Sequence, residues 1–327
     1  MALVPAIAHA QRLYAVTGIR NAGGIGYASH VASINNLGQV LGYYQWTSTG
    51  GRGSSRTNHE AWLDEGGVAT PLSLGNFLPV KMNDLGTIIG DALGGHPSMY
   101  KNGTMYTLST TIGFVTDIDN DDNVVGVLGG GAAPYSATEW SNGSQISLCP
   151  LGQMSTATAI GDGLIAGSVE LNAGSGVWFF GGDINNPQFI MTGDPFYDTI
   201  TAISSRGVAV GYREDRPLGG GAYYYAVMYK NGVLIPLDRT QTNGGSWANA
   251  INSQEVIVGA KNGHATMWRN GIETDLNRLI PANSGWVLAE AKSINDRGQI
   301  VGTGAYQGAP MPFLLNPTLP ISITPHG

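Results

Sequence analysis

The chain has 327 residues, of which 12% are charged and 49 are glycine, and its formal net charge is −7. This acidic balance lacks the basic surface by which proteins bind nucleic acid. No apolar run approaches the roughly 20 residues of a membrane-spanning helix. So much glycine without a collagen period indicates many tight turns between short strands. Cys149 is the only cysteine, so no internal disulfide can form.

The first ten residues differ from the rest of the chain. Residues 2–8 are apolar, and Ala8-His9-Ala10 has the A-x-A form of a signal-peptidase site, although no Lys or Arg precedes the apolar stretch. We interpret residues 1–10 as the remnant of a secretory signal peptide, which predicts an extracellular or periplasmic protein. An ordinary N-terminal tail is the alternative.

One pattern of about ten residues recurs along the chain. It contains a small residue, Ile or Met, Asn or Asp, a short stretch with Gly, two apolar residues and a final Gly. The copies lie at residues 33–42, 81–90, 117–126, 159–167, 202–211, 250–259 and 293–302. Their spacing averages about 43 residues, which is typical of a propeller blade. The sequence therefore predicts an all-β fold, a single seven-bladed β-propeller of four-stranded antiparallel blades over residues 11–327.

A second pattern lies between the copies: a strand ending in an aromatic residue, a short turn with Gly, and another strand. In four cases the turn is Asn-Gly, beginning at Asn102, Asn142, Asn231 and Asn270. Asn-Gly favours the hairpin turn that matches strand twist. Each repeat therefore holds two hairpins, with strands a to d. Asn35 and its counterparts begin the a–b turn, where we expect them to bond the local backbone rather than form a ring of ligands.

The two ends of the chain are expected to meet. Residues 13–19 precede the first copy where a d strand belongs, while the seventh repeat supplies only strands a, b and c. An N-terminal strand that completes the last blade would leave no open sheet edge. Residues 320–324 are the alternative for that place.

These motifs resemble those of the HAF-repeat proteins, a family described as extracellular repeat proteins. The best-matching segments are residues 34–42, residues 294–302 and His264-Ala265-Thr266-Met267-Trp268-Arg269-Asn270-Gly271. The resemblance covers about residues 13–316. It departs from the pattern at Gly161, which replaces Asn, and at Leu63 and Leu315, which replace the aromatic residue. It implies secretion and a propeller-like array, but no reaction.

Strand parity assigns the connections of a propeller to two faces, with a–b and c–d turns on one face and b–c and d–a loops on the other. The long loops, at residues 45–58, 213–222, 238–248 and 277–290, are all of the second kind. Variable loops on a rigid scaffold commonly carry function, so we expect the b–c/d–a face to bind a ligand. The candidate ligand-binding residues are Trp46, Arg52, Arg56, Arg213, Arg216, Arg239, Trp247 and Trp286, because aromatic platforms with cations suit a sugar or an acidic polymer. The alternative is that each Trp packs its own loop.

Three histidines, His59, His96 and His264, are assigned to one repeat position, where Tyr225 stands in the fifth repeat. A residue that recurs in register is expected to bond within its own blade. The alternative is that these residues face the central funnel and bind metal or move protons, which makes them weak catalytic candidates. We expect His59 and His96 on the same face as the three tryptophans, opposite the Asn-Gly turns.

Four residues, Asp117, Asp119, Asp121 and Asn123, are spaced like the start of a calcium loop. The usual Gly is missing at the sixth place and Glu at the twelfth. The repeat also makes this segment a strand that enters a turn. It is therefore a weak metal candidate, and we expect no cofactor.

No nucleophile-elbow, zinc-protease or phosphate-loop motif occurs in the chain. We therefore predict a secreted or cell-surface binding module, expected to be a monomer, whose ligand is a glycan or a surface partner at the b–c/d–a face. One alternative is a polysaccharide-active lyase or hydrolase that uses His, Tyr and Arg in the funnel. The other is a structural cell-surface repeat protein without a ligand.

Overall fold

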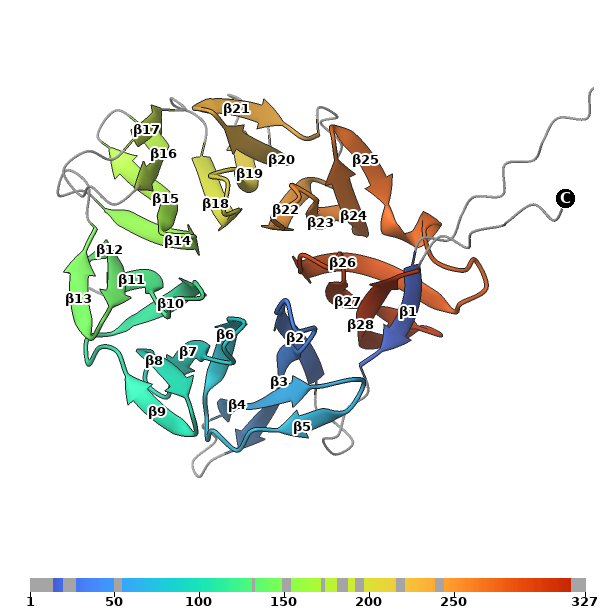
Figure 1. Cartoon of the computed structure of the whole chain (residues 1–327), viewed down its shortest axis with the longest axis horizontal. Coiled ribbons are helices and arrows are strands. Elements are labelled where there is room, and N and C mark those ends of the chain that lie inside the picture. Colours follow the sequence, from blue (N-terminus) through green and yellow to red (C-terminus); the bar gives the residue numbers. More distant parts are fainter. Residues whose placement is uncertain are drawn as a thin grey trace, which may run out of the picture.

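The computed structural model contains seven four-stranded antiparallel sheets arranged as blades around an axis, so the predicted seven-bladed propeller is confirmed (Figure 1). The structure describes residues 14–19, 28–49, 55–130, 133–148, 154–171, 174–180, 188–191, 197–215, 221–238 and 244–318. The proposed signal remnant at residues 1–10 and the alternative closing segment at residues 320–324 lie outside these ranges. Within them, no helix has the length and apolar character needed to span a membrane.

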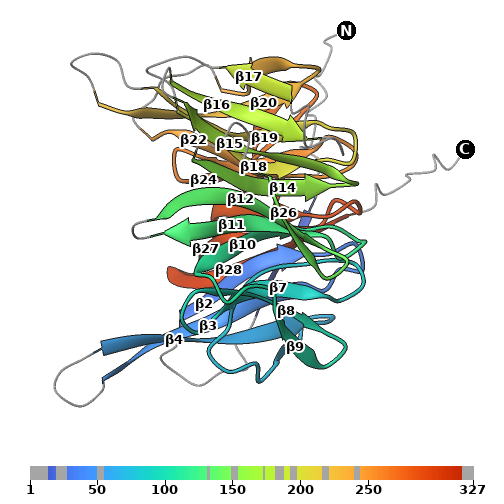
Figure 2. The same ribbon diagram turned by 90° about the vertical axis from the view of Figure 1, so that its left-hand side faces the viewer.

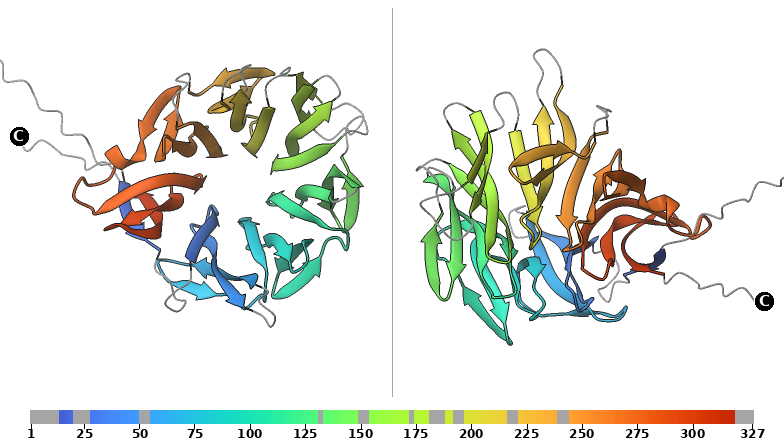
Figure 3. Two further views of the ribbon diagram at one scale, coloured as in Figure 1. Left: turned by 180° about the vertical axis from the view of Figure 1, so that it is seen from behind. Right: turned by 45° about the horizontal axis from the view of Figure 1, so that its top comes forward.

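Each blade runs from strand a at the axis to strand d at the rim, and the same innermost strands surround the axis when the disc is seen from behind (Figure 3). Blade 1 contains β2 (Ala28–Ile34), β3 (Val40–Thr49), β4 (Ser55–Asp64) and β5 (Ala69–Pro71). Blade 2 contains β6 (Leu78–Met82), β7 (Ile88–Ala92), β8 (His96–Lys101) and β9 (Thr104–Thr107). Blade 3 contains β10 (Gly113–Ile118), β11 (Val124–Gly130), β12 (Ala133–Ser141) and β13 (Ser144–Ser147).

The remaining blades repeat this order. Blade 4 contains β14 (Ser155–Gly161), β15 (Leu164–Leu171), β16 (Gly174–Phe180) and β17 (Gln188–Met191). Blade 5 contains β18 (Tyr197–Ile203), β19 (Ala209–Asp215), β20 (Tyr223–Lys230) and β21 (Val233–Pro236). Blade 6 contains β22 (Ser246–Ile251), β23 (Ile257–Lys261), β24 (His264–Arg269) and β25 (Ile272–Asp275), followed by the short 3-10 helix η3 (Leu276–Arg278). Blade 7 contains β26 (Trp286–Ile294), β27 (Ile300–Tyr306), β28 (Ala309–Pro317) and β1 (Tyr14–Gly18).

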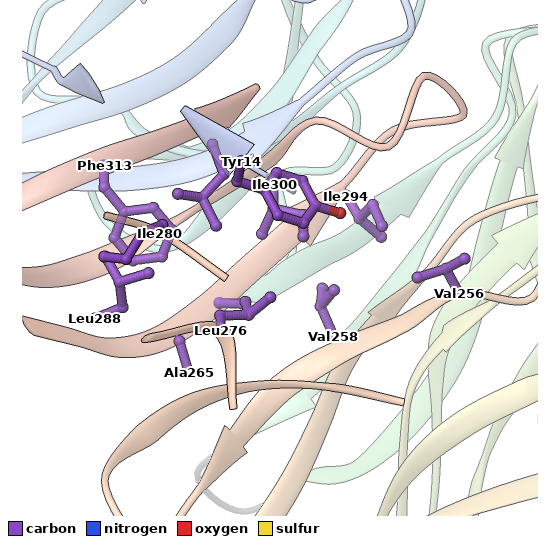
Figure 4. Packing of buried hydrophobic residues seen from close by; sticks show 12 residues of the cluster. Tyr14, Val256, Val258, Ala265, Leu276, Ile280, Leu288, Ile294, Ile300 and Phe313 are labelled. Carbon is purple, nitrogen blue, oxygen red and sulfur yellow. The ribbon is translucent and has the colours of Figure 1, made fainter. Parts of the chain in front are cut away.

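The N-terminal strand β1 closes the ring, as the sequence predicts. It pairs antiparallel with β28, from Tyr14 opposite Pro317 to Gly18 opposite Phe313. The Tyr14 ring is buried in the apolar cluster between blades 6 and 7, and its backbone N–H donates to the carbonyl of Leu279 at 3.2 Å (Figure 4). The first strand of the chain thus becomes the outer strand of the last blade.

The core lies between neighbouring blades rather than at one centre. In blade 1, Leu41 packs on Phe77 of blade 2, whereas Val40, on the other side of the same sheet, packs with Val301 of blade 7. Both faces of each sheet are therefore covered. Sheets that are buried on both sides favour continuous apolar runs over alternating ones, which accounts for the paired apolar residues in every motif copy.

The turn asparagines do more than bond their own turn. Asn35 Oδ1 accepts hydrogen bonds from the backbone N–H groups of Leu37 and Gln39, at 3.1 and 3.0 Å, as the sequence predicts. Its Nδ2 also donates to the carbonyl of Asn83 in blade 2 at 3.2 Å. The same amide-to-carbonyl bond runs from Asn83 to Asp119, from Asn252 to Asn295 and from Asn295 to Asn35. These side chains therefore connect blade 6 through blades 7, 1 and 2 to blade 3.

Strand a of every blade carries a β-bulge at the same register. The residues that the ladder skips are Ala32, Val80, Thr116, Thr158, Thr201, Asn249 and Lys292. The last Gly of the motif, on strand b, lies opposite each bulge. There the backbone of strand a lies very close to the Cα atom of this Gly. A Cβ on Gly259 would lie 1.9 Å from the carbonyl oxygen of Trp247, and one on Gly211 would lie 1.8 Å from that of Thr199. The bulge therefore explains why each motif copy ends in Gly.

The strand pairing corrects the alignment of the first repeat. The residues that pair with the motif Gly are Trp62 in blade 1, Ser98 in blade 2 and Thr266 in blade 6. Counting from these, the position of His96 and His264 corresponds to Glu60 in blade 1, not to His59. Because side chains alternate between the two faces of a strand, His59 lies on the other face of its sheet. The assignment of three histidines to one position is therefore wrong by one residue.

The bulge predicts a large cost for a methyl group at the motif Gly. Gly259→Ala should lower the free energy of unfolding by about 3 kcal/mol, because the backbone of strand a must move away. Urea denaturation of the purified protein measures this change. Gly221→Ala is the matched control, since nothing lies within 4 Å of a Cβ there, and it should stay within about 0.5 kcal/mol of wild type. Equal stability of the two variants would contradict the role of the bulge.

The closure of blade 7 predicts that β1 is required for stability. Removing residues 1–19 should lower the free energy of unfolding by more than about 3 kcal/mol, because the buried Tyr14 ring is lost and the β28 edge is exposed. Thr17→Ala, an exposed change on the same strand, should have little effect. An unchanged melting temperature in the shortened protein would show that β1 is dispensable.

Candidate functional site

The predicted tryptophans and histidines lie on one face of the disc and the Asn-Gly turns on the other, as the sequence predicts. We call the side with the b–c and d–a connections the loop face and the opposite side the turn face. Trp46 and His59 lie toward the end of the long β3–β4 hairpin, which extends beyond the disc (Figure 2), and His96, Trp247 and Trp286 lie at or near the starts of β8, β22 and β26. Asn102, Asn231 and Asn270 occupy turns on the turn face, with φ between 51° and 52°.

Aromatic rings gather on the loop face. We call them the aromatic arc: His30, Tyr43 and His59 in blade 1, Phe114 and Tyr135 in blade 3, Tyr212 and Tyr224 in blade 5, Trp247 in blade 6, and Trp286 and Tyr306 in blade 7. Rings that contact each other, within one blade or between blades 5 and 6, have centroids 4.9 to 6.5 Å apart. Most of these residues lie toward the b–c or d–a ends of their strands, and Tyr43, His59 and Tyr212 lie nearer the middle. The arc is thus spread over five blades.

The tryptophan of blade 6 joins two blades. Trp247 stacks on Tyr224 of blade 5, with centroids 6.0 Å apart and planes at 29°, and Tyr212 contacts Tyr224 edge-on at 6.1 Å. The indole also covers Gly245, where a Cβ would lie only 3.0 Å from it. Trp247 therefore packs its own connection, which was the alternative to ligand binding, while part of its surface stays exposed.

The other two tryptophans have different surroundings. Trp286 contacts Tyr306 at 5.4 Å and Phe313 at 6.3 Å, and its ring lies 3.1 Å from the place of a Cβ on Gly18. It therefore supports the closing strand β1. Trp46 pairs with Asn58 in the β3–β4 hairpin and is partly exposed. The three predicted tryptophans share a face but form no common stack.

Arg213 is held inside blade 5. Its Nε and Nη2 donate to the two carboxylate oxygens of Asp198 at 3.1 and 3.3 Å, and the Asp198 side chain is fully buried. Tyr229 donates its hydroxyl to the same carboxylate at 2.5 Å, and burial followed by the Asp198 charge raises the pKa of Tyr229. Tyr225, a weak catalytic candidate, also bonds to Arg213. This network keeps a buried carboxylate paired, so Arg213 is engaged within its blade.

The remaining candidate arginines contribute little to a described site. Arg56 is exposed on the β3–β4 hairpin, where its carbonyl accepts a bond from Asn58 at 3.2 Å. Arg52, Arg216 and Arg239 lie outside the described residues.

His59 is brought together with a histidine that the sequence analysis missed. His30 stacks on Tyr43 with centroids 4.9 Å apart, and Tyr43 meets the edge of His59 at 5.6 Å. Burial lowers the pKa of both histidines; His59 and Lys292 lower that of His30 further, while the bond to Asn76 opposes the effect at His59. Lowered pKa values keep both imidazoles neutral near pH 7 and able to accept a proton.

The other two histidines have no place in this cluster. His264 is exposed on blade 6, and its Nδ1 lies 2.9 Å from Asp275 Oδ2, so it bonds within its own blade as expected. His96 begins β8, and its Nδ1 is buried without a hydrogen-bond partner. The described contacts of His59, His96 and His264 do not include one another, so the structure does not bring the three predicted histidines together.

The calcium candidate is used by the fold. Asp117 accepts bonds from the N–H groups of Ile118 and Ile160, the latter in blade 4, and it also pairs with Lys81. Asp119 Oδ1 accepts from the N–H groups of Asp121 and Asn123, both at 2.9 Å. These contacts occupy the carboxylates of Asp117 and Asp119, two of the four residues in the pattern. Across the described ranges no group of three or more His, Cys, Asp or Glu residues is placed to hold a metal.

An exposed apolar surface of the loop face lies on blades 2 and 3. Phe114 and Tyr135 are in edge contact at 6.5 Å, yet they remain 39% and 41% exposed. Leu93 and Ile112 stand on neighbouring connections and are also exposed. This surface is not among the predicted sites, because the long loops were expected to carry function and blades 2 and 3 have short ones. An exposed apolar patch on a rigid scaffold commonly marks an interaction site.

No family model matches the chain, and no curated protein matches it in sequence. The resemblance to the HAF-repeat proteins therefore rests on the motifs alone. Comparison with solved structures gives many matches. The three described below are 8 to 10% identical to this chain and inform only the fold.

The β-propeller domain of the trilobed protease from Pyrococcus furiosus, which has an open velcro topology, matches with a TM-score of 0.59 at 8% identity over 92% of this chain and 100% of that one. TolB from Acinetobacter baumannii matches with a TM-score of 0.47 at 9% identity over 86% of this chain. The chain spans 64% of that TolB chain. The intramolecular trans-sialidase from Ruminococcus gnavus has a TM-score of 0.38 at 10% identity, over 89% of this chain and 94% of that one. The match to the β-propeller domain of the trilobed protease, whose TM-score exceeds 0.5, agrees with the propeller architecture.

A partly buried carboxyl next to β10 predicts a pH dependence. Burial raises the pKa of Asp91 to about 6, against the opposing hydrogen bond from Val115 N–H at 3.1 Å. The folded state therefore binds this proton more tightly than the unfolded chain, and stability from this group falls as the pH rises from about 4 to 6. Asp91→Asn, which keeps an acceptor oxygen, should raise the melting temperature at pH 7 and leave it unchanged near pH 4. A constant difference across this range would contradict the raised pKa.

Proposed function

We propose that this protein is a non-enzymatic binding propeller whose loop face engages a glycan or a glycan-bearing surface partner. The observation that carries the proposal is the aromatic arc. Its rings are amphipathic or apolar, and such rings supply large contact area with little loss of conformational freedom on binding. On the turn face, by contrast, the asparagine side chains are used in contacts between blades.

Within the arc, Phe114 and Tyr135 are the preferred contacts. They project from paired strands rather than from loops, so their positions are set before a ligand arrives. Preorganisation of this kind lowers the entropic cost of binding. Trp247 and Trp286 are committed partly to packing, and we assign them a supporting role at the edge of the site.

We further propose that the protein acts outside the cell or in the periplasm. The A-x-A sequence at residues 8–10 and the resemblance to the HAF-repeat proteins support this location. A surface for extracellular glycans would be useful there, and a monomer suffices because each disc carries its own arc.

A second candidate function is a polysaccharide-active lyase or hydrolase. The contact of His30, Tyr43 and His59 favours it, because neutral imidazoles beside a phenol can exchange protons with a bound sugar. Burial raises the pKa of Tyr43, so its hydroxyl keeps its proton near neutral pH. This cluster lies on the same face as the proposed binding surface.

A glycan array followed by calorimetry on the bound glycans tests the proposal. Tyr135→Ala should weaken binding about tenfold, which corresponds to the loss of one well-placed aromatic contact. Tyr106→Ala is the matched control: Tyr106 is 47% exposed but lies on β9 at the rim of blade 2. It should change the affinity by less than about twofold.

The same glycans separate the two functions. An assay for new reducing ends or unsaturated products should remain negative if the protein only binds. Turnover that is lost in both His30→Ala and His59→Ala would establish the enzyme instead. An array without any bound glycan, or equal losses in Tyr135→Ala and Tyr106→Ala, would reject binding through the arc and leave a structural repeat protein.

A further inference from the structure

The turn face contains a cavity on the propeller axis that is separate from the loop face. It has a volume of about 430 Å³ and is lined by the a–b turns of all seven blades. This volume lies within the range of small-molecule sites. Each turn contributes residues from the same positions of the motif. Side chains from one position therefore lie at the same depth in the cavity and form a layer.

The inner layer is apolar. It consists of the Ile and Met side chains at the second position of the motif, among them Ile118, Ile160 and Ile203, which are largely buried. The outer layer is polar and contains the Asn, Asp and Ser residues of the turns. A ligand in this cavity would therefore meet an apolar floor and a polar rim.

The rim differs between the two halves of the ring. In blades 6, 7, 1, 2 and 3 the turn side chains bond one another. For example, Asp84 accepts from Asn36 N, Asn36 Nδ2 and Asn120 Nδ2, and Asp296 accepts from Ser253 N at 2.8 Å. These acceptors are already occupied, so this part of the rim serves the fold.

Within the described ranges, the turns of blades 4 and 5 lack such bonds between blades, because Gly161 and Ser204 replace the asparagine of the motif. Among the described residues, the side chains of Asp121, Asp162 and Ser205 line the cavity without a hydrogen bond to the protein. Two carboxylates and a hydroxyl therefore face the cavity beside Ile160 and Ile203. These polar groups are available to a ligand.

The charge of the lining selects the ligand. Five aspartates, Asp84, Asp119, Asp121, Asp162 and Asp296, line the cavity together with a single lysine, Lys81, whose ammonium pairs with Asp117. A cavity with an acidic rim concentrates cations. The apolar floor disfavours a small hydrated metal ion, because such an ion prefers a shell of oxygen ligands.

We propose that this axial cavity binds an organic cation with an apolar body, an alkylammonium group, whose charge lies against Asp162 and Asp121 and whose alkyl chain lies over Ile160 and Ile203. The group can come from a free amine or from a lysine side chain of a partner protein. The proposal is independent of glycan binding, since the two sites lie on opposite faces of the disc.

Titration of the full chain with n-pentylammonium tests the proposal, followed by the isoleucine methyl signals in NMR spectra. The methyl signals of Ile160 and Ile203 should shift in a saturable manner, and n-pentanol, the neutral counterpart, should bind at least about tenfold more weakly, as expected for loss of a charge-assisted hydrogen bond. A blocked pentapeptide with a central lysine, compared with its norleucine counterpart, distinguishes the two sources. Binding of the peptide indicates a partner protein, and binding of the free amine alone indicates a small ligand.

Asp162→Asn is the decisive variant. Asp162 has a φ of 52° in a two-residue turn, the conformation that Asn adopts at residues 142, 231 and 270, so the change removes a charge without straining the fold. It should weaken pentylammonium binding about tenfold, whereas Asp215→Asn, the same charge change at the end of β19 on the loop face, should leave it unchanged. Equal binding of pentylammonium and pentanol, no methyl shift at Ile160 and Ile203, or an unaltered affinity in Asp162→Asn would each overturn the proposal.

Discussion

The side-chain amide of the turn asparagine is the contact on which the ring depends. Its oxygen holds the a–b turn of its own blade, and its nitrogen donates to a carbonyl of the next blade. One planar group therefore sets both the shape of a blade and the position of its neighbour. The amide itself is buried, and a buried amide left without hydrogen-bond partners would cost about 1 to 3 kcal/mol, so the geometry is strongly enforced wherever Asn is present.

The bulge in strand a extends this connection. It places a side chain such as Thr116 or Thr201 where its hydroxyl reaches a carbonyl of the next blade, at 2.8 and 2.6 Å. The close approach of the backbone requires Gly on strand b. Between blades 4 and 5, where Asn is replaced, an apolar cluster that includes Ile200 and Tyr229 joins the sheets instead. The ring is therefore continuous, but its polar contacts are distributed unevenly.

Because the polar contacts between blades are distributed unevenly, some surfaces are used to hold the fold together and others remain for ligands. At the axial cavity of the turn face, many described polar side chains are used in contacts between blades, whereas those of Asp121, Asp162 and Ser205 remain for a ligand. On the loop face the strands end in aromatic residues that contact one another without being fully covered. A rigid disc with two chemically different faces can bind two kinds of ligand without a change in shape.

The sequence by itself determined the number of blades, the closing strand and the face of each connection, because repeat spacing, Asn-Gly turns and strand parity are local properties. It also predicted that Asn35 bonds its own turn. Only the tertiary structure decided which side chains meet: His30 with His59 through Tyr43, Arg213 with Asp198, and Phe114 with Tyr135. These contacts depend on strand register, and a shift of one residue moves a side chain to the other face of its sheet. The misplaced alignment of His59 shows this, since repeat spacing alone does not fix the pairing of β3 with β4.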